Sequence, residues 1–272
     1  MYYVACCVVF LVAYLVNVTL ISVFYHRGLA HGAVKLSPGG RKFVALMGNW
    51  LTGLDPKGWV CMHRMHHEHS DTELDPHSPR NAGLVGVLFE QLRSYERILI
   101  GLARRETAYV QIVRDLDFPI SWLNRNRVWY LPYVIHALVA VVLGIAFGWW
   151  LLGGAYFLGI MSHPFEGWAV NSLGHGVGGR NFATPDDSRN NTFAGLLIAG
   201  EGYQNNHHAF PRSAKFSYRA SEIDLGYAIC HVLQLFGVLT IDREELITRA
   251  VPRMSAPDAG PAPALAAPLT SR

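Results

Sequence analysis

The chain has 272 residues, of which 51% are hydrophobic, and its mean hydropathy is +0.18. These values fit either one large globular domain or a small membrane protein. The formal net charge is only +3 and no concentrated basic run is present, which argues against nucleic-acid binding. The four cysteines form no CxxC pattern, so no disulfide framework is expected.

The first apolar segment runs from Tyr3 to Phe24 and contains no charged side chain. Its 22 residues are enough for an α-helix to cross a bilayer, which takes roughly 20. A cleaved signal peptide would need a basic n-region and a small-residue cleavage site, and the segment has neither. We therefore expect a transmembrane helix over residues 3–24, which leads directly into His26 and His31 of the motif HRGLAH.

Two further helices are expected near the membrane surface. Lys42–Leu54 is apolar but too short to span at 13 residues, and it fits a helix that lies at the interface. Gly83–Leu102 mixes apolar and charged residues in an amphipathic pattern. This second segment fits a helix that rests on the membrane and an ordinary packed helix equally well.

Two more apolar segments follow one another with almost no connection. Residues 130–152 carry no charge, and residues 153–172 come directly after them. Together they predict a transmembrane hairpin that turns near residues 149–154, with tryptophans at the interface. Lys and Arg flank the inner ends of the spans and are absent from the outer turn, so the inner side is predicted to be cytoplasmic. The flanking residues are Arg27, Lys35, Arg41, Lys42, Arg125, Arg127 and Arg180.

Histidines are concentrated between Trp59 and His77, which contain five of the 13 in the chain. His63, His66 and His67 are spaced i, i+3, i+4, so on a helix they project from one face. Similar spacings recur: Gln204, His207 and His208 repeat i, i+3, i+4, and Asn171 and His175 are four apart. A single histidine is more often a surface or core residue. Several groups at ligand spacing indicate one shared metal site, and imidazole without thiolate suits iron, zinc, copper or nickel.

His163 and Glu166 lie inside a hydrophobic segment, where ionisable residues are costly and are functional candidates by default. His163 is twelve residues before His175, roughly 18 Å along a straight helix. It is therefore not expected to bind the same metals.

The motifs HRGLAH, HRMHH, NSLGH and GEGYQNNHH, in that order, resemble those of the membrane fatty acid desaturases of the stearoyl-CoA desaturase type, over roughly residues 26–239. The resemblance implies an all-α integral membrane protein whose transmembrane helices carry a cytoplasmic helical cap with a histidine-rich di-iron site. By motif position, the implied ligands of two Fe²⁺ ions are His26, His31, His63, His66, His67, His175, His207 and His208. Asn171 would hold a metal-bound water, and Trp59 would line the acyl tunnel.

The sequence departs from the family pattern at two places. Gln204 stands where the last motif usually begins with histidine. Its carbonyl oxygen could bind iron, its amide could hold a water, or the site could have been lost. The family usually has two spans before the first histidine motif, whereas one fits here.

The resemblance implies an O₂-dependent acyl desaturase that introduces a cis double bond, at Δ9, into a saturated fatty acyl-CoA or acyl-lipid. Zinc has no redox chemistry, so iron is the expected metal. A separate ferredoxin, rubredoxin or cytochrome b5-like donor would supply electrons. The expected location is a bacterial inner membrane, in contact with membrane lipid. A related di-iron hydroxylase or ketolase and a histidine-rich metal transporter are the alternatives.

The domain is expected to cover residues 1–250. Residues 251–272 are rich in Pro and Ala and are predicted to be a disordered tail.

Overall fold

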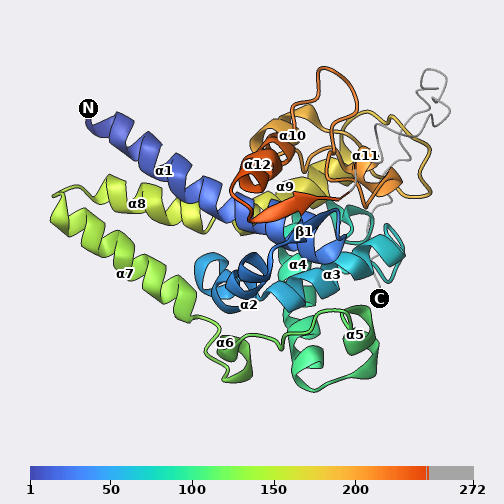
Figure 1. Ribbon diagram of the computed structural model, residues 1–272, viewed down its shortest axis with the longest axis horizontal. Coiled ribbons are helices and arrows are strands. Elements are labelled where there is room, and N and C mark those ends of the chain that lie inside the picture. The colour runs from blue at the N-terminus through green and yellow to red at the C-terminus, as the bar shows by residue number, and fades with distance from the viewer. Residues whose placement is uncertain (243, 245–272) are drawn as a thin grey trace, which may run out of the picture.

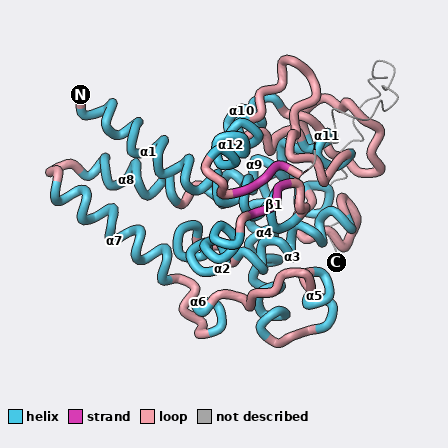
Figure 2. Tube along the Cα trace, viewed as in Figure 1, coloured by secondary structure: helices cyan, strands magenta, loops and turns pink. Residues whose placement is uncertain are grey.

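A computed structural model describes residues 1–242 and residue 244. The predicted tail, residues 251–272, lies outside this range. The described chain is mostly helical, with one small sheet. Helices α1, α7 and α8 extend to one side as an arm, and the other elements form a cap at its base (Figure 1). Loops are concentrated in the cap (Figure 2).

The arm begins with a long continuous helix. α1 (Tyr2–Val18) passes without a break into the π-helix η1 (Thr19–Ala30). Together they form the one helix of the described residues that is long and apolar enough to cross a membrane, at 29 residues. Gly32 follows with φ +62°, the left-handed conformation that commonly ends a helix. The helix is thus longer than the predicted span 3–24 and includes the first histidine motif.

The predicted hairpin is present as two shorter apolar helices, α7 (Leu131–Ala146) and α8 (Trp150–Ile160), joined through Gly148 at φ +63°. The predicted segment 153–172 is divided, because α8 ends before Met161 and α9 (His163–Gly176) starts a new helix. Pro164 lies in the first turn of α9, where its missing N–H costs no hydrogen bond.

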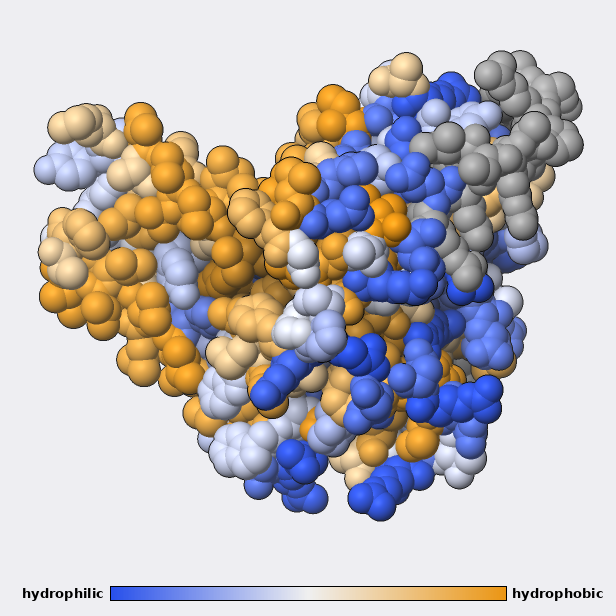
Figure 3. Space-filling model, in the orientation of Figure 1, coloured by the Kyte–Doolittle hydropathy of each residue, from blue (hydrophilic) through white to orange (hydrophobic). Residues whose placement is uncertain are grey.

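On the face shown in Figure 3, most of the arm is covered by apolar side chains, whereas most of the cap is hydrophilic. Val8 and Leu11 on α1 and Val142 and Ile145 on α7 are more than half exposed. Monomeric proteins rarely expose a contiguous apolar surface of this kind to water. The arm therefore has the kind of surface that is expected where a protein is shielded from water.

Three cap helices start with the same local signal, a capping residue followed by proline. Ser37, Asp55 and Ser78 each accept a hydrogen bond from a backbone N–H of the first turn, and proline occupies the next position. These residues begin α2 (Pro38–Thr52), α3 (Pro56–His69) and α4 (Pro79–Ala103). The predicted interfacial segment 42–54 overlaps α2 over residues 42–52. The predicted amphipathic segment 83–102 lies within α4 and makes up most of it.

The remaining cap helices are short, and some lie in long loops. They are α5 (Thr107–Ile112), α6 (Trp122–Arg125), α10 (Thr192–Leu197), α11 (Gln204–Ala209) and α12 (Leu225–Leu235). The strands β1 (Val34–Leu36) and β2 (Leu239–Ile241) pair antiparallel, with Val34 opposite Ile241. This sheet is an addition to the expected all-α fold, and it ties the end of the described chain to the exit of η1.

The main hydrophobic core lies in the cap, where η1, α3 and α4 meet. Val23 of η1, Val60 and Cys61 of α3 and Ile98 of α4 are all buried there. Each buried aliphatic side chain of this size contributes roughly 1.5–3 kcal/mol. The core fixes η1 against α3, the two helices that carry the first two histidine motifs.

Candidate metal centre

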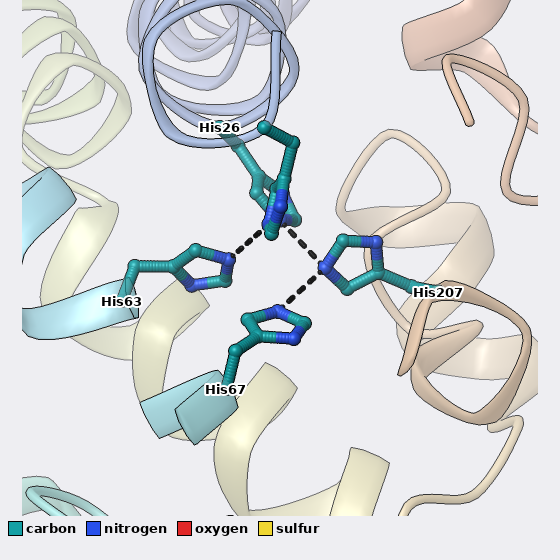
Figure 4. Close-up of side chains that lie close together, drawn as sticks. His26, His63, His67 and His207 are labelled. Carbon is teal, nitrogen blue, oxygen red and sulfur yellow. Dashed lines mark hydrogen bonds between the residues drawn. The ribbon is translucent and has the colours of Figure 1, made fainter. Parts of the chain in front are cut away.

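The histidine motifs come together in the cap and form two adjacent clusters. The first contains His26, His31, His63, His67 and His207, whose ligand nitrogens all lie within 4.8 Å of one another. Figure 4 shows His26 of η1, His63 and His67 of α3 and His207 of α11 pointing toward a common centre. The nitrogens face each other closely: His26 Nε2 and His67 Nε2 are each 2.9 Å from His207 Nε2.

The π-helical geometry of η1 explains how His26 and His31 reach the same cluster. In an α-helix, residues five apart are separated by about 140° around the axis. In a π-helix the hydrogen bond runs over five residues, so these positions lie above one another. His31 N donates to His26 O at 3.2 Å, which is that hydrogen bond. The widened helix therefore brings both histidines of the HRGLAH motif to the same cluster.

α3 supplies both clusters. His63 and His67, four residues apart, enter the first cluster, while His66 enters the second with His175 and His208. α11 divides in the same way, because His207 joins the first cluster and His208 the second. The i, i+3, i+4 spacing thus places the rings on one broad helix face, as predicted, but that face borders two sites rather than one.

The second cluster consists of His66 of α3, His175 of α9 and His208 of α11. Their ring centroids are 4.9–5.1 Å apart. The Nε2 atom of each ring is buried without a hydrogen-bond partner. Buried polar atoms normally have partners, so three such nitrogens side by side indicate a site for a ligand that accepts electron pairs.

On the opposite side of each ring, a carboxylate holds the Nδ1 atom. His66 pairs with Asp75 at 2.9 Å, His175 with Asp71 at 2.8 Å and His208 with Asp186 at 2.5 Å. In the first cluster, His26 Nδ1 pairs with Glu201 at 2.6 Å. A carboxylate behind a histidine fixes the ring and places the lone pair on Nε2, which is the usual arrangement at metal sites.

Burial keeps several of the clustered histidines in the neutral form that binds metals. Burial, followed by the positive charges of neighbouring rings, lowers the pKa of His63, His67 and His207 well below the ordinary value. Burial also lowers the pKa of His208 to about 4. Burial alone would raise the pKa of Asp71, but hydrogen bonds from His175 and Ser78 lower it overall. At neutral pH these four imidazoles are therefore uncharged, whereas the Asp71 carboxylate is ionised.

The spacing of the facing nitrogens fits a first-row transition metal. Metal–nitrogen bonds of about 2.1 Å place two ligand nitrogens at right angles about 3.0 Å apart. The observed contacts in the first cluster, 2.7–2.9 Å, lie close to this value. All eight histidines identified from the sequence lie in one of the two clusters. The donor set therefore fits two metal ions. Helix α3 borders both sites, with His63 and His67 in the first cluster and His66 in the second.

The other residues singled out from the sequence border the same region. Trp59 stacks on His63 with ring centroids 4.9 Å apart. Gln204 Nε2 donates to Glu201 O at 2.8 Å, and its Cγ lies against Gly174, the neighbour of His175. Asn171 lies one turn before His175, with its amide 3.5 Å from Gln91 Oε1. His163, which was not expected to be a ligand, belongs to neither cluster.

A narrow cavity of ≈ 100 Å³ adjoins both clusters. Trp59, His63, His66, Asn171 and Gln204 are among the residues that line it. Much of the remaining lining is apolar, from Val18, Ile21, Leu54, Met62, Val170 and Ile198. The cavity can therefore hold a slender nonpolar chain beside the histidine nitrogens.

Several functional residues were not identified from the sequence. Asp71 and Asp75 belong to SDTELDPHS, directly after the second motif, and Glu201 starts the last motif, so their proximity to histidines was a usable signal. Asp186 lies in a loop more than 20 residues from His208 and gave no local signal. His77 also lies beside the second cluster, with its ring 4.6 Å from that of His66 and its Nδ1 buried without a partner.

Known proteins are similar to this chain over most of its length. The family model described as fatty acid desaturase matches residues 2–220. A hex-5-enoyl acyl-carrier-protein acetylenase from Moorena producens is 34% identical, with 80% of this chain and 70% of the relative aligned. The Arabidopsis thaliana delta-9 acyl-lipid desaturase 1 is 31% identical, over 85% of this chain and 72% of the relative. An acyl-CoA C20 delta5-desaturase from Anemone leveillei is 34% identical, over 79% and 66%.

The matched region includes all four histidine motifs, and the resemblance inferred from them is confirmed. The relatives are desaturases and an acetylenase, enzymes that oxidise acyl chains. The chain therefore belongs to the fatty acid desaturase family and is an oxidoreductase.

Proposed function

We propose that this protein removes two hydrogens from adjacent methylenes of a saturated acyl chain and leaves a cis double bond. The observation that carries the proposal is the position of one largely apolar cavity beside two clusters of buried and partly buried histidines. The reaction balances as –CH₂–CH₂– plus O₂, two electrons and two protons giving –CH=CH– and two waters. Two of the four electrons that O₂ takes up come from the substrate and two from an external donor.

Two Fe²⁺ ions are the proposed cofactor, because they can activate O₂ and zinc cannot. His26, His31, His63, His67 and His207 would hold one ion, and His66, His175 and His208 the other. Asp71, Asp75, Asp186 and Glu201 would keep the rings oriented. The protein's own contribution is position, because the cavity wall holds one C–C bond against the site and excludes water.

Gln204 is proposed to complete the site of the second ion. Its amide nitrogen is engaged by Glu201 O, which leaves its Oε1 as the atom to face the cavity, and Gln204 lies against the residue preceding His175. These contacts support binding through the carbonyl oxygen or through a water held with Asn171. They do not favour a lost site, since the three histidines of the cluster and their carboxylates are all present.

The substrate is proposed to be an acyl-CoA or acyl-lipid, with Trp59 in the tunnel wall and the double bond at Δ9. The two Arabidopsis relatives named delta-9 acyl-lipid desaturases support this position. A relative named as a delta-5 desaturase gives a competing bond position, and one named for an acyl-carrier protein gives a competing head group. Product analysis must distinguish these alternatives.

The arm is proposed to lie in the membrane with the cap on the cytoplasmic side, in a bacterial inner membrane. The long apolar helix and the apolar surface of the arm support insertion. The Lys and Arg residues that flank the inner ends of the apolar segments in the sequence support the orientation. A separate ferredoxin, rubredoxin or cytochrome b5-like protein is the proposed electron donor.

The test is the fatty-acid profile of a host that expresses this chain with a ferredoxin and its reductase. We expect a new monounsaturated acid, with the double bond located by mass spectrometry. His67→Ala removes a ligand of the first cluster and should abolish the product, whereas His231→Ala, at an exposed position on α12, should not.

Iron content of the purified proteins completes the test. We expect two irons per chain in the wild type and fewer in His67→Ala. Unsaturation that persists in His67→Ala would contradict the assignment of the histidines. A product that carries oxygen from ¹⁸O₂ would assign the protein to the hydroxylases instead.

A further inference from the structure

Glu166 of α9 is a buried carboxyl in the wall of the cavity beside the metal centre. It is only 7% exposed, and it lines the same cavity as His63 of the first cluster and His66 of the second. No positively charged side chain of the described residues forms an ion pair with it. A buried ionisable group without a charged partner is costly. The metal centre as described gives Glu166 no role, so its position calls for one.

A second carboxylate, that of Glu201, lines the same cavity and acts on Glu166. Glu201 has partners of its own, because Arg27 and His26 hold it at 2.8 Å and 2.6 Å. Burial, with a further contribution from the charge of Glu201, raises the pKa of Glu166 to about 7, against the opposing effect of a hydrogen bond with Ser162. Glu166 can therefore hold and release a proton near neutral pH.

The hydrogen bonds of Ser162 fit a protonated Glu166. Ser162 Oγ is 2.5 Å from Glu166 Oε1 and 2.8 Å from the carbonyl oxygen of Gly159. A hydroxyl has a single hydrogen, so it cannot donate fully to both oxygens. Both contacts are satisfied when Ser162 donates to Gly159 O and the carboxyl of Glu166 donates to Ser162 Oγ. Ser162 is itself partly exposed, so this contact leads from the buried carboxyl to a more accessible hydroxyl.

The other titratable groups around Glu166 are less suited to donating a proton. His163, three residues earlier in α9, lines the cavity, but burial lowers its pKa to about 3, so its ring is neutral. Burial raises the pKa of Tyr95, a further cavity residue, well above its ordinary value. The hydroxyl of Tyr14 on α1 donates to the carbonyl oxygen of Leu197. Among these groups, only Glu166 combines a place in the cavity wall with a proton that it can release.

The proposed oxidation consumes two protons per turnover in a cavity that excludes bulk water. We propose that Glu166 is a catalytic acid that supplies these protons from the cavity wall. Each proton leaves the carboxyl for the oxygen that is being reduced, and the resulting carboxylate takes a new proton from solvent by way of Ser162. Two electrons come from the acyl chain and two from the external donor, as in the overall reaction. The inference rests on the proposed function and adds an acid to it.

Infrared spectroscopy of the purified, iron-loaded protein without substrate tests the protonation state apart from turnover. We expect the wild type to show the carbonyl band of a protonated carboxylic acid at pH 6, and this band to disappear at pH 9. Glu166→Gln should lack the change. Glu96→Gln, which alters an exposed glutamate of α4, should keep it. A wild type with no such band at pH 6 would overturn the proposal.

Turnover of palmitoyl-CoA by the purified protein, with a ferredoxin and its reductase, is the second measurement. Glu166→Gln should lower kcat on the order of 10²-fold, the usual contribution of a general acid, with the KM and the iron content of the wild type. Wild-type kcat should fall above a pH of about 7, because only the protonated carboxyl can donate, and the residual rate of Glu166→Gln should not. Glu166→Asp should keep more of the rate, and Glu96→Gln all of it.

The outcomes separate this inference from the proposed function. Glu166→Gln with the kcat and the pH profile of the wild type would overturn the role of Glu166 and leave the desaturase assignment intact. A loss of iron together with the loss of activity would also overturn it, because Glu166 would then support the metal centre rather than supply protons. No unsaturated product from the wild type would overturn both.

Discussion

Asp71 holds His175 across 104 positions of sequence, with 2.8 Å between Oδ2 and Nδ1. The same carboxylate accepts hydrogen bonds from Ser78 Oγ and from the backbone N–H of Asp187. Asp71 itself has φ +59°, a left-handed conformation that is uncommon for a residue other than glycine. One carboxylate thus joins the loop after α3, helix α9 and the loop that carries Asp186, and strain of this kind is typical of functional sites.

The first prediction concerns this contact. Asp71→Asn keeps the shape of the side chain but removes the charge that orients His175. We expect the second metal ion to bind 10–100-fold more weakly, a cost typical of losing such a partner. Titration of the metal-free protein with Fe²⁺ under anaerobic conditions would measure this.

Glu73→Gln is the matched control, because Glu73 lies in the same loop, is exposed and touches neither cluster. It should bind both ions as the wild type does. If Asp71→Asn retained the full affinity for two ions, the carboxylate would have only a structural role.

The second prediction concerns Arg27, which is completely buried next to His26 of the first cluster. Its guanidinium pairs with Glu201 at 2.8 Å and with Asp224 at 3.0 Å, and it covers the ring of Phe216. Arg27→Met would leave two buried carboxylates without their cation, which typically costs 3–5 kcal/mol. We expect a melting temperature in detergent lowered by many degrees.

Arg212→Met provides the comparison, since Arg212 is exposed and forms no ion pair within the described chain. It should leave the melting temperature nearly unchanged. Equal stability of Arg27→Met and Arg212→Met would show that the buried network contributes little to the fold.

Much of the metal centre could be predicted from local spacing. His63, His66 and His67 lie within one helix turn, so their common face follows from helical geometry alone. The same applies to His207 and His208 in α11. The resemblance to a known family then supplied His26 and His31, whose five-residue separation fits an α-helix poorly and a π-helix well.

The remaining features depend on contacts between distant segments. Asp186 reaches His208 from a loop, and β1 pairs with β2 across about 200 residues, so no local pattern reveals either. The division of the histidines between two clusters follows from where α3, α9 and α11 pack, which spacing does not determine. The end of α8 before His163 was detectable in principle, because Pro164 marks a helix start.

The third prediction concerns pH. Burial lowers the pKa of His31, His63, His67 and His207 well below 6.5 in the folded protein, whereas the unfolded chain titrates them near 6.5. Below pH 6.5 the unfolded chain therefore binds more protons than the folded one, and the stability of the metal-free protein falls. Each such histidine contributes up to about 1.4 kcal/mol per pH unit.

Thermal denaturation of chelator-treated protein between pH 5 and 8 would measure this. We expect a plateau above pH 6.5 and a steep loss below it. His207→Gln removes one titrating ring and should make the loss shallower by about one proton. A melting temperature that stays constant down to pH 5 would show that the clustered histidines are not buried as described.

The fourth prediction concerns the packing of the apolar hairpin. A Cβ atom at Gly153 of α8 would lie 2.0 Å from the carbonyl oxygen of Ala140 on α7, whereas at the neighbouring Gly154 it would meet nothing within 4 Å. Small residues let helices approach closely where no hydrophobic force drives them together in a lipid environment. Gly153→Ala should therefore push α7 and α8 apart at a cost of roughly 1–3 kcal/mol.

Gly154→Ala adds the same methyl group one position away and should be neutral or slightly stabilising, since alanine favours a helix. Melting temperatures in detergent would compare the two, and a loss that is the same for both would mean that α7 and α8 do not meet at Gly153.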